Sequence, residues 1–170
     1  MATFSLARFL PIESGARNAL RTLWDTLGGL PGGPALFSRL VGRAAPYTGT
    51  IGARVVELRR GFARVQMADR PGLRNHLASV HAVALVNLAE LTGNAALAYS
   101  MPDDARFIVS GLSIEYVKKS RGTIEASCEC PVPESSERME FAVPVVMRDP
   151  SGDVVARATL RSLVGPKKRG

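Results

Sequence analysis

The chain has 170 residues, 46% of them hydrophobic and 22% charged, a composition that argues against an intrinsically disordered protein and suits one globular domain. The formal net charge of +7 is compatible with nucleic acid, an acidic lipid surface or a phosphate-bearing small molecule as partner. The apolar runs fall short of the roughly 20 residues that a membrane-spanning helix needs, and residues 1–10 match a signal peptide poorly. We therefore expect a soluble, cytoplasmic protein with no membrane partner.

Two amphipathic helices are predicted before the first strand. Residues 14–28 place apolar side chains at helical spacing, and Ser14 suits the N-cap position. Residues 35–43 form a second, shorter helix that ends before Pro46, because the residue before a proline is driven out of the helical region. We interpret residues 1–45 as an N-terminal helical extension of the domain that follows.

The rest of the chain has the pattern of strands, apart from one long apolar helix. Residues 52–58 and 61–67 are predicted strands, and residues 79–98 are the predicted helix. Four more strands follow at residues 106–117, 122–130, 138–148 and 153–163. A helix that is apolar on most of its surface must be buried, so we expect an α+β fold in which an antiparallel sheet of six strands wraps around it. Residues 46–165 form this domain, and residues 166–170 form a basic tail.

The basic residues and the cysteines give weaker signals. Lys118, Lys119 and Arg121 form the one concentrated basic patch outside the tail. A basic strand with interleaved aromatic residues, as in RNA-binding sheets, is absent from the sequence, so a nucleic-acid-binding protein is kept only as a rival from another class. Cys128 and Cys130 are expected to be free thiols, because a Cys-x-Cys pair has too few ligands for a closed zinc site.

One line of polar side chains crosses the predicted long helix. At 100° per residue, Asn87, Glu90 and Asn94 fall within about 60° of one another, and Val83 lies on the same line. These side chains either face solvent or form a site, because an ionised carboxylate is costly to bury without a partner. His81 lies near the helix start, where backbone N–H groups without intrahelical partners can hold an oxyanion or a carbonyl oxygen.

The spacing of Asn75, His81 and Glu90 resembles that of the acyl-CoA thioesterases with the hot-dog fold, in particular the PaaI-like branch. The run Arg-Asn-His-Leu-Ala-Ser-Val-His-Ala, followed by Asn-Leu-Ala-Glu-Leu-Thr-Gly, is similar to the less characterised DUF4442 group of the same superfamily. The likeness covers most of residues 35–164. It implies a hot-dog fold, in which the sheet curls around the helix at 79–98.

The resemblance implies three catalytic residues. Glu90 matches the carboxylate that acts as general base on water or as nucleophile. Asn75 matches the asparagine near the thioester or the attacking water. His81, with the backbone N–H of Ala82, matches the group that polarises the thioester carbonyl. In such families the site lies at a dimer interface, so we expect a homodimer or a dimer of dimers, with Glu90 and His81 from different subunits.

The resemblance also implies a set of substrate-binding residues. This set comprises Ala82, Val83, Asn87, Asn94, Lys118, Lys119 and Arg121. The three basic residues are candidates to meet the phosphates of coenzyme A by charge complementarity. Ala82 and Val83 occupy the positions of the two glycines that usually follow the histidine, and the β-branched side chain of Val83 narrows the site.

We therefore predict an enzyme that hydrolyses acyl-CoA or a related thioester. It needs neither metal nor redox cofactor, and coenzyme A enters only as part of the substrate. The rival on the same fold is a non-catalytic protein that binds acyl-CoA or a fatty-acyl ligand, and the missing glycines favour it. The expected partners are the thioester and further copies of the chain.

Overall fold

The computed structural model describes residues 18–167, which fold into one sheet and its associated helices. In chain order the elements are α1 (Ala19–Leu27), α2 (Gly33–Ala44), α3 (Pro46–Gly49), β1 (Arg54–Arg59), β2 (Phe62–Met67), the 3-10 helix η2 (Pro71–Leu73), α4 (Ala82–Ser100), β3 (Ala105–Tyr116), β4 (Ile124–Glu129), β5 (Met139–Arg148) and β6 (Val154–Pro166). Among these, no helix combines the length and the apolar character needed to cross a membrane.

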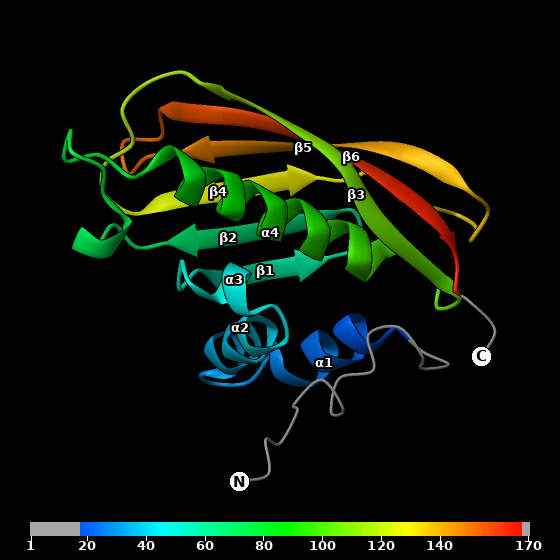
Figure 1. The fold of residues 1–170 in the computed structure, drawn as a ribbon. Coiled ribbons are helices and arrows are strands. Elements are labelled where there is room, and N and C mark those ends of the chain that lie inside the picture. Colours follow the sequence, from blue (N-terminus) through cyan, green and yellow to red (C-terminus); the bar gives the residue numbers. More distant parts are fainter. Residues whose placement is uncertain (1–17, 168–170) are drawn as a thin grey trace, which may run out of the picture.

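The six strands form one antiparallel sheet in the order β1-β2-β4-β5-β6-β3. The sheet curls around α4 (Figure 1). β3, which is 12 residues long, pairs with β6 along its length with one register shift between Val109 and Gly111, and within the described chain its other edge has no strand partner. The predicted α+β architecture with a sheet wrapped around one long helix is therefore confirmed.

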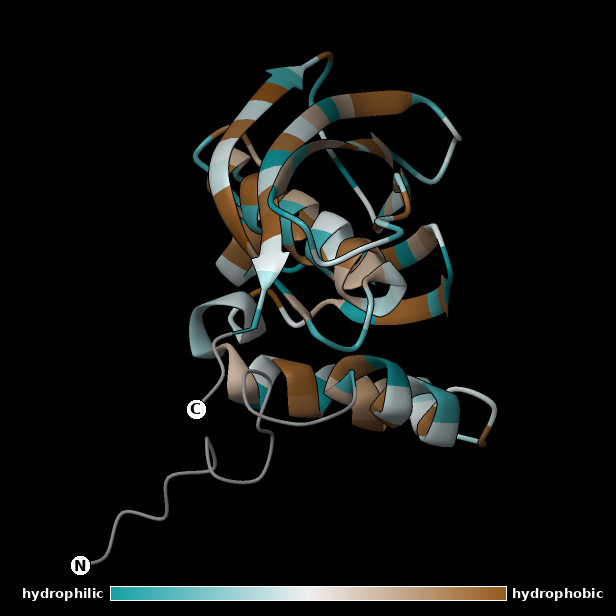
Figure 2. Ribbon diagram, turned by 90° about the vertical axis from the view of Figure 1, so that its right-hand side faces the viewer, coloured by the Kyte–Doolittle hydropathy of each residue, from teal (hydrophilic) through white to brown (hydrophobic). Residues whose placement is uncertain are grey.

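The core lies between α4 and the concave face of the sheet. Leu88 and Leu97 of α4 are fully buried, as are Leu160 and Val143 of the strands facing them. Gly93 allows this close approach, because a Cβ at that position would lie 3.1 Å from Leu160 and 3.2 Å from Val143. Figure 2 shows the apolar residues of α4 enclosed by the strands.

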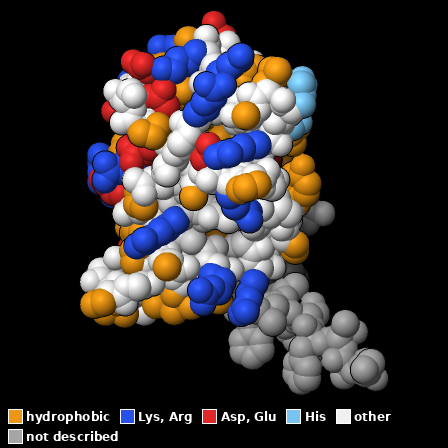
Figure 3. Space-filling view, turned by 90° about the vertical axis from the view of Figure 1, so that its left-hand side faces the viewer, with side chains coloured by type: hydrophobic (Ala, Val, Ile, Leu, Met, Phe, Trp, Pro, Cys, Tyr) orange, Lys and Arg blue, Asp and Glu red, His pale blue; other side chains and the backbone are white. Residues whose placement is uncertain are grey.

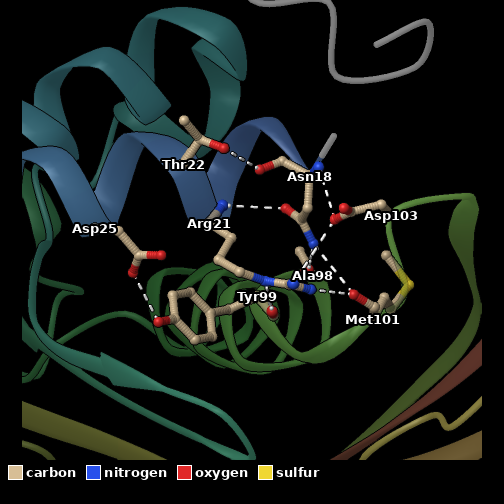
Figure 4. A network of polar contacts seen from close by, with 8 residues as sticks. All are labelled: Asn18, Arg21, Thr22, Asp25, Ala98, Tyr99, Met101 and Asp103. Atoms are coloured by element: carbon tan, nitrogen blue, oxygen red, sulfur yellow. Dashed lines mark hydrogen bonds and ion pairs between the residues drawn. The ribbon is translucent and has the colours of Figure 1, made fainter. Parts of the chain in front are cut away.

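The N-terminal helices attach to the C-terminal end of α4 and to β1. The Asn18 side chain caps α1 by accepting from the Arg21 N–H at 3.0 Å, and its amide nitrogen donates to the Ala98 carbonyl. Arg21 donates to the carbonyl oxygens of Tyr99 and Met101 (Figure 4). The predicted cap Ser14 lies outside the described residues, and α1 begins at Ala19 because Asn18 supplies the cap.

The long helix begins three residues later than predicted, at Ala82. The two residues before His81 are held outside the helix, since the N–H of Val80 and the hydroxyl of Ser79 both donate to the carbonyl of Ser120. The hydrophobic periodicity of the sequence around Ser79 does not reveal this tertiary contact. At the other end of the chain, the predicted tail at 166–170 lies largely outside the described residues, although Pro166 still belongs to β6.

Both cysteines are buried free thiols. Cys128 lies in β4 and Cys130 directly follows this strand, and the two thiols are close enough to form a hydrogen bond. A hydrogen bond with the Cys130 thiol, together with burial, raises the pKa of Cys128, so this thiol stays protonated at neutral pH. In the described chain, no group of three or more His, Cys, Asp or Glu side chains is arranged to hold a metal ion.

Candidate functional site

Asn75 shapes the loop that leads into α4. Its side-chain oxygen accepts from the N–H of Leu77 at 2.9 Å and of Ser79 at 3.3 Å, and its own N–H donates to the Ser79 carbonyl at 2.8 Å. Ala78 takes a left-handed conformation, with φ of 52°, to close this turn. The oxygen of Asn75 is thus occupied in folding, and its amide N–H₂ group is the part left to meet a ligand.

His81 is the N-cap residue of α4. Its Nδ1 accepts the N–H of Val83 at 3.1 Å, which assigns the ring proton of the neutral imidazole to Nε2. The N–H of Ala82 has no acceptor within the described chain. Two donors, the Ala82 N–H and the His81 Nε2–H, therefore stand at the positive end of the helix, an arrangement suited to a developing oxyanion.

The predicted polar line on α4 divides into three environments. Asn87 is buried, 5% exposed, and its amide donates to the Tyr47 carbonyl at 3.1 Å, so it ties α4 to α3. Glu90 is exposed. Asn94 is half-buried, and its side-chain oxygen is buried without a hydrogen-bond partner. The interpretation as a purely solvent-facing line is therefore wrong for Asn87, because α3 covers it.

His81 and Glu90 of one chain do not face a common point. Nine residues of α-helix separate them by about 13 Å along the axis and by half a turn around it. In a thioester, the carbonyl oxygen that His81 would contact and the carbonyl carbon that Glu90 would act on are only one bond apart. One thioester therefore cannot contact both residues of the same chain. The histidine and the carboxylate can act together only if they come from two chains.

Two cavities adjoin the outer face of α4. The first, about 960 Å³, lies between α1 and α2 on one side and α4, β3 and β6 on the other; it is lined mainly by apolar side chains, and we call it the apolar groove. The second, about 820 Å³, lies between α2, α3 and β1. Val41, Thr48, Val55 and Leu91 line both cavities, and Leu91 is the residue next to Glu90.

The predicted basic patch lies against the loop of Asn75 and His81, because Ser120 accepts hydrogen bonds from Ser79 and Val80. Lys118 is already engaged there. Its ammonium group lies 2.7 Å from Asp149 and 2.6 Å from Asp153, and these contacts raise the pKa of Lys118 and lower that of Asp149. Its neighbours Lys119 and Arg121 are exposed.

Three arginines near the second cavity were missed by the sequence analysis. Arg39 and Arg43 come from α2 and Arg54 from β1, and all three line the cavity. The spacing of four between the first two places them on one face of a helix, a signal that the sequence contained. The contribution of Arg54 was not readable from the sequence, because it depends on how α2 packs against β1.

Comparison with known proteins places these features in a family. The model of the family described as domain of unknown function DUF4442 matches residues 33–164. The crystal structure of the genomics protein APC5556 is similar over 86% of this chain and 98% of its own, with 31% identity and a TM-score of 0.75.

Two further structures show the same fold. One is a Pseudomonas aeruginosa protein of unknown function described as a probable thioesterase, with 23% identity over 81% of this chain and 97% of its own and a TM-score of 0.70. The other is a thioesterase family protein from Silicibacter pomeroyi, with 16% identity over 76% of this chain and 96% of its own and a TM-score of 0.66. The comparison with curated proteins gives no significant match.

Proposed function

The chain belongs to the DUF4442 family and has the hot-dog fold of the thioesterase superfamily, and from this premise we propose that it hydrolyses an acyl thioester with Glu90 as general base or nucleophile. One observation carries the proposal. Glu90 is an exposed carboxylate on α4, and the residue next to it lines an apolar cavity of about 960 Å³ that suits an acyl chain.

The chemistry needs few groups. Glu90 accepts a proton from water while the water oxygen bonds to the thioester carbon, and the carbonyl oxygen becomes an oxyanion. His81 Nε2–H and the Ala82 N–H donate to this oxyanion. When the carbon–sulfur bond breaks, Glu90 returns the proton to the thiolate, so the products are a carboxylic acid and a thiol. These steps require neither a metal nor a redox cofactor.

The site is completed by a second copy of the chain. The opposite placement of His81 and Glu90 on one helix supports this. β3 supports it as well, because within the described chain its outer edge pairs with no strand and can therefore pair with a strand of a second copy. β3 also carries exposed apolar side chains, since Ile108 is 65% and Tyr116 47% exposed. A homodimer or a dimer of dimers would cover them and bring Glu90 of one subunit to the Asn75–His81 loop of another.

The neighbouring residues tune the site. The amide nitrogen of Asn75 is available to a thioester or a water molecule, and Asn94 offers an unpartnered oxygen. Val83 is 51% exposed beside the two donors, so its branched side chain restricts which acyl group can approach. Asn87 acts by holding α3 in place.

A non-catalytic acyl-binding protein is the second candidate, and the presence of Ala82 and Val83 where glycines usually stand favours it. A panel of acyl-CoA substrates with free-thiol detection separates the two candidates. We expect hydrolysis by the wild type, unchanged by a chelator, and a loss of at least about 100-fold in Glu90→Gln. The control Glu134→Gln makes the same change on an exposed loop and should retain the rate. Hydrolysis that survives Glu90→Gln contradicts the mechanism, and binding without hydrolysis supports the second candidate.

A further inference from the structure

We propose that Arg39, Arg43 and Arg54 form a phosphate-binding pocket for the carrier part of the thioester, so that the substrate is a coenzyme A ester held by its nucleotide phosphates. The assignment of the ligand rests on the proposed function, whereas the anion site itself rests on the geometry alone. We call this site the arginine pocket.

The arginine pocket gathers three positive charges, and no acidic residue of the described chain lines it to neutralise them. Arg39, Arg43 and Arg54 all line one cavity of about 820 Å³, and its lining within the described chain includes no Asp or Glu. All three arginines are exposed, and none of their guanidinium groups has a hydrogen bond or ion pair to another described residue. A guanidinium fork matches the oxygens of a phosphate in a bidentate manner, so three such groups favour a multiply charged phosphate ligand.

Several other basic side chains of the protein are neutralised by carboxylates. Arg74 pairs with Asp69 at 2.7 Å, Arg64 pairs with Glu57 at 3.2 Å, and Lys118 pairs with two aspartates. Figure 3 shows the same contrast on one face, where acidic side chains lie among the basic ones in the upper part and are absent from the visible lower part, at the level of the N-terminal helices.

The walls of the pocket are fixed by close backbone contacts. A Cβ at Gly49 would lie 2.6 Å from the carbonyl oxygen of Gly42, so glycines are needed where α3 meets α2. The guanidinium of Arg70 donates to the Thr50 carbonyl at 2.6 Å and stands near Gly52, which brings a fourth cation to the rim. The backbone where α3 meets α2, on one side of the pocket, is therefore held in place.

The position of the pocket selects its ligand. It shares four lining residues with the apolar groove, and one of them, Leu91, follows Glu90 in the chain. An elongated ligand can thus place an acyl chain in the groove, its thioester beside Glu90 and its phosphates at the arginines. The patch of Lys118, Lys119 and Arg121 is less suited to this role, because Asp149, Asp153 and Asp69 contact that turn.

Binding of coenzyme A, measured by calorimetry, tests the pocket without reference to catalysis. We expect the double variant Arg43→Gln with Arg54→Gln to lose affinity at least about tenfold, because charge-assisted hydrogen bonds from arginine to phosphate are stronger than neutral ones. Arg60→Gln is the matched control, since it removes one exposed arginine about 20 Å along the chain from Arg54. Arg43→Lys with Arg54→Lys keeps the charge and should recover part of the affinity.

Kinetics identify which part of the substrate the pocket recognises. The KM for an acyl-CoA should rise at least about tenfold in the double glutamine variant, whereas the KM for the same acyl group on N-acetylcysteamine, which carries no phosphate, should stay unchanged. An acyl carrier protein substrate is the third arm, and a rise in KM for that substrate alone would overturn the assignment to coenzyme A. Unchanged coenzyme A affinity in the double variant, or a loss in Lys119→Gln instead, would overturn the pocket.

These outcomes keep the two proposals apart. Hydrolysis that depends on Glu90 but not on the arginines contradicts the pocket and leaves the thioesterase proposal intact. Arginine-dependent binding of coenzyme A by a protein that hydrolyses no thioester supports the pocket and contradicts the proposed hydrolysis. Because the three arginines are exposed, the variants should keep the thermal midpoint of the wild type.

Discussion

The inner and outer faces of α4 perform different tasks. The inner face buries Leu88 and Leu97 completely and brings Gly93 against the sheet. The outer face carries the exposed Val83 and Glu90, leaves a buried oxygen of Asn94 without a partner, and adjoins two cavities. One helix thus provides the core of the domain and its candidate site, so substitutions on its two faces should separate stability from activity.

The largest effect on stability is expected at the inner face. Leu88→Ala removes a fully buried side chain and should lower the free energy of unfolding by about 2–5 kcal/mol. Urea unfolding followed by circular dichroism measures this difference. Val83→Ala, on the outer face, should stay within about 0.5 kcal/mol of the wild type; equal losses in the two variants would contradict the division of the helix.

Gly93 offers a sharper test of the same contact. Gly93→Val adds a branched side chain where even a Cβ would lie 3.1 Å from Leu160, so α4 must move away from the sheet. We expect a loss of about 1–3 kcal/mol in the free energy of unfolding, from overpacking. A combined Leu160→Ala change should recover part of this loss by making room, and a purely additive result would rule out direct contact between the two positions.

The N-terminal helices should contribute less. Arg21→Ala removes the two hydrogen bonds from α1 to the carbonyls at the end of α4, and we expect a cost of about 1–2 kcal/mol in chemical unfolding. Thr22→Ala, on the same helix but bonded only within it, should cost less. If Arg21→Ala has no effect, the attachment of α1 rests on its other contacts with α4, among them the hydrogen bond from Asn18 to Ala98.

The smallest effect concerns the turn beside Lys118. The lysine holds the pKa of Asp149 below its usual value of 3.8, so the ion pair stabilises the fold above that pH, and this contribution is lost as the pH falls through the lowered pKa. Asp149→Asn keeps an oxygen for the N–H groups of Ser151 and Asp153 and removes the charge. The thermal midpoint of the variant should lie below that of the wild type at pH 7 and converge with it in acid; a constant difference would contradict this.

The fold was predictable from sequence because its strongest signals are local. The apolar run from Ala84 to Leu97 and the alternating strands indicate a buried helix and a curled sheet, and both are present. The start of α4 was missed because Ser120, far away in the chain, holds Ser79 and Val80 in an extended conformation. Periodicity contains no information about such a contact.

The residues of the candidate site could be predicted from the sequence, but their surroundings in the folded chain could not. The spacing of Asn75, His81 and Glu90 is visible in the sequence, but the burial of Asn87 depends on α3, a helix of four residues that leaves no periodic pattern. The arginine pocket also depends on tertiary packing, because it joins α2 to β1.

The central claim is that Glu90 of one subunit acts with His81 of another, and a mixing experiment tests it most directly. Glu90→Gln and His81→Ser, in which serine keeps the helix cap, should each be nearly inactive as homodimers. Co-refolded in equal amounts, they form heterodimers in which one of the two sites has both native residues, so about a quarter of the wild-type activity should return. Mixed protein that forms heterodimers yet is no more active than its parents would contradict a site shared between two chains.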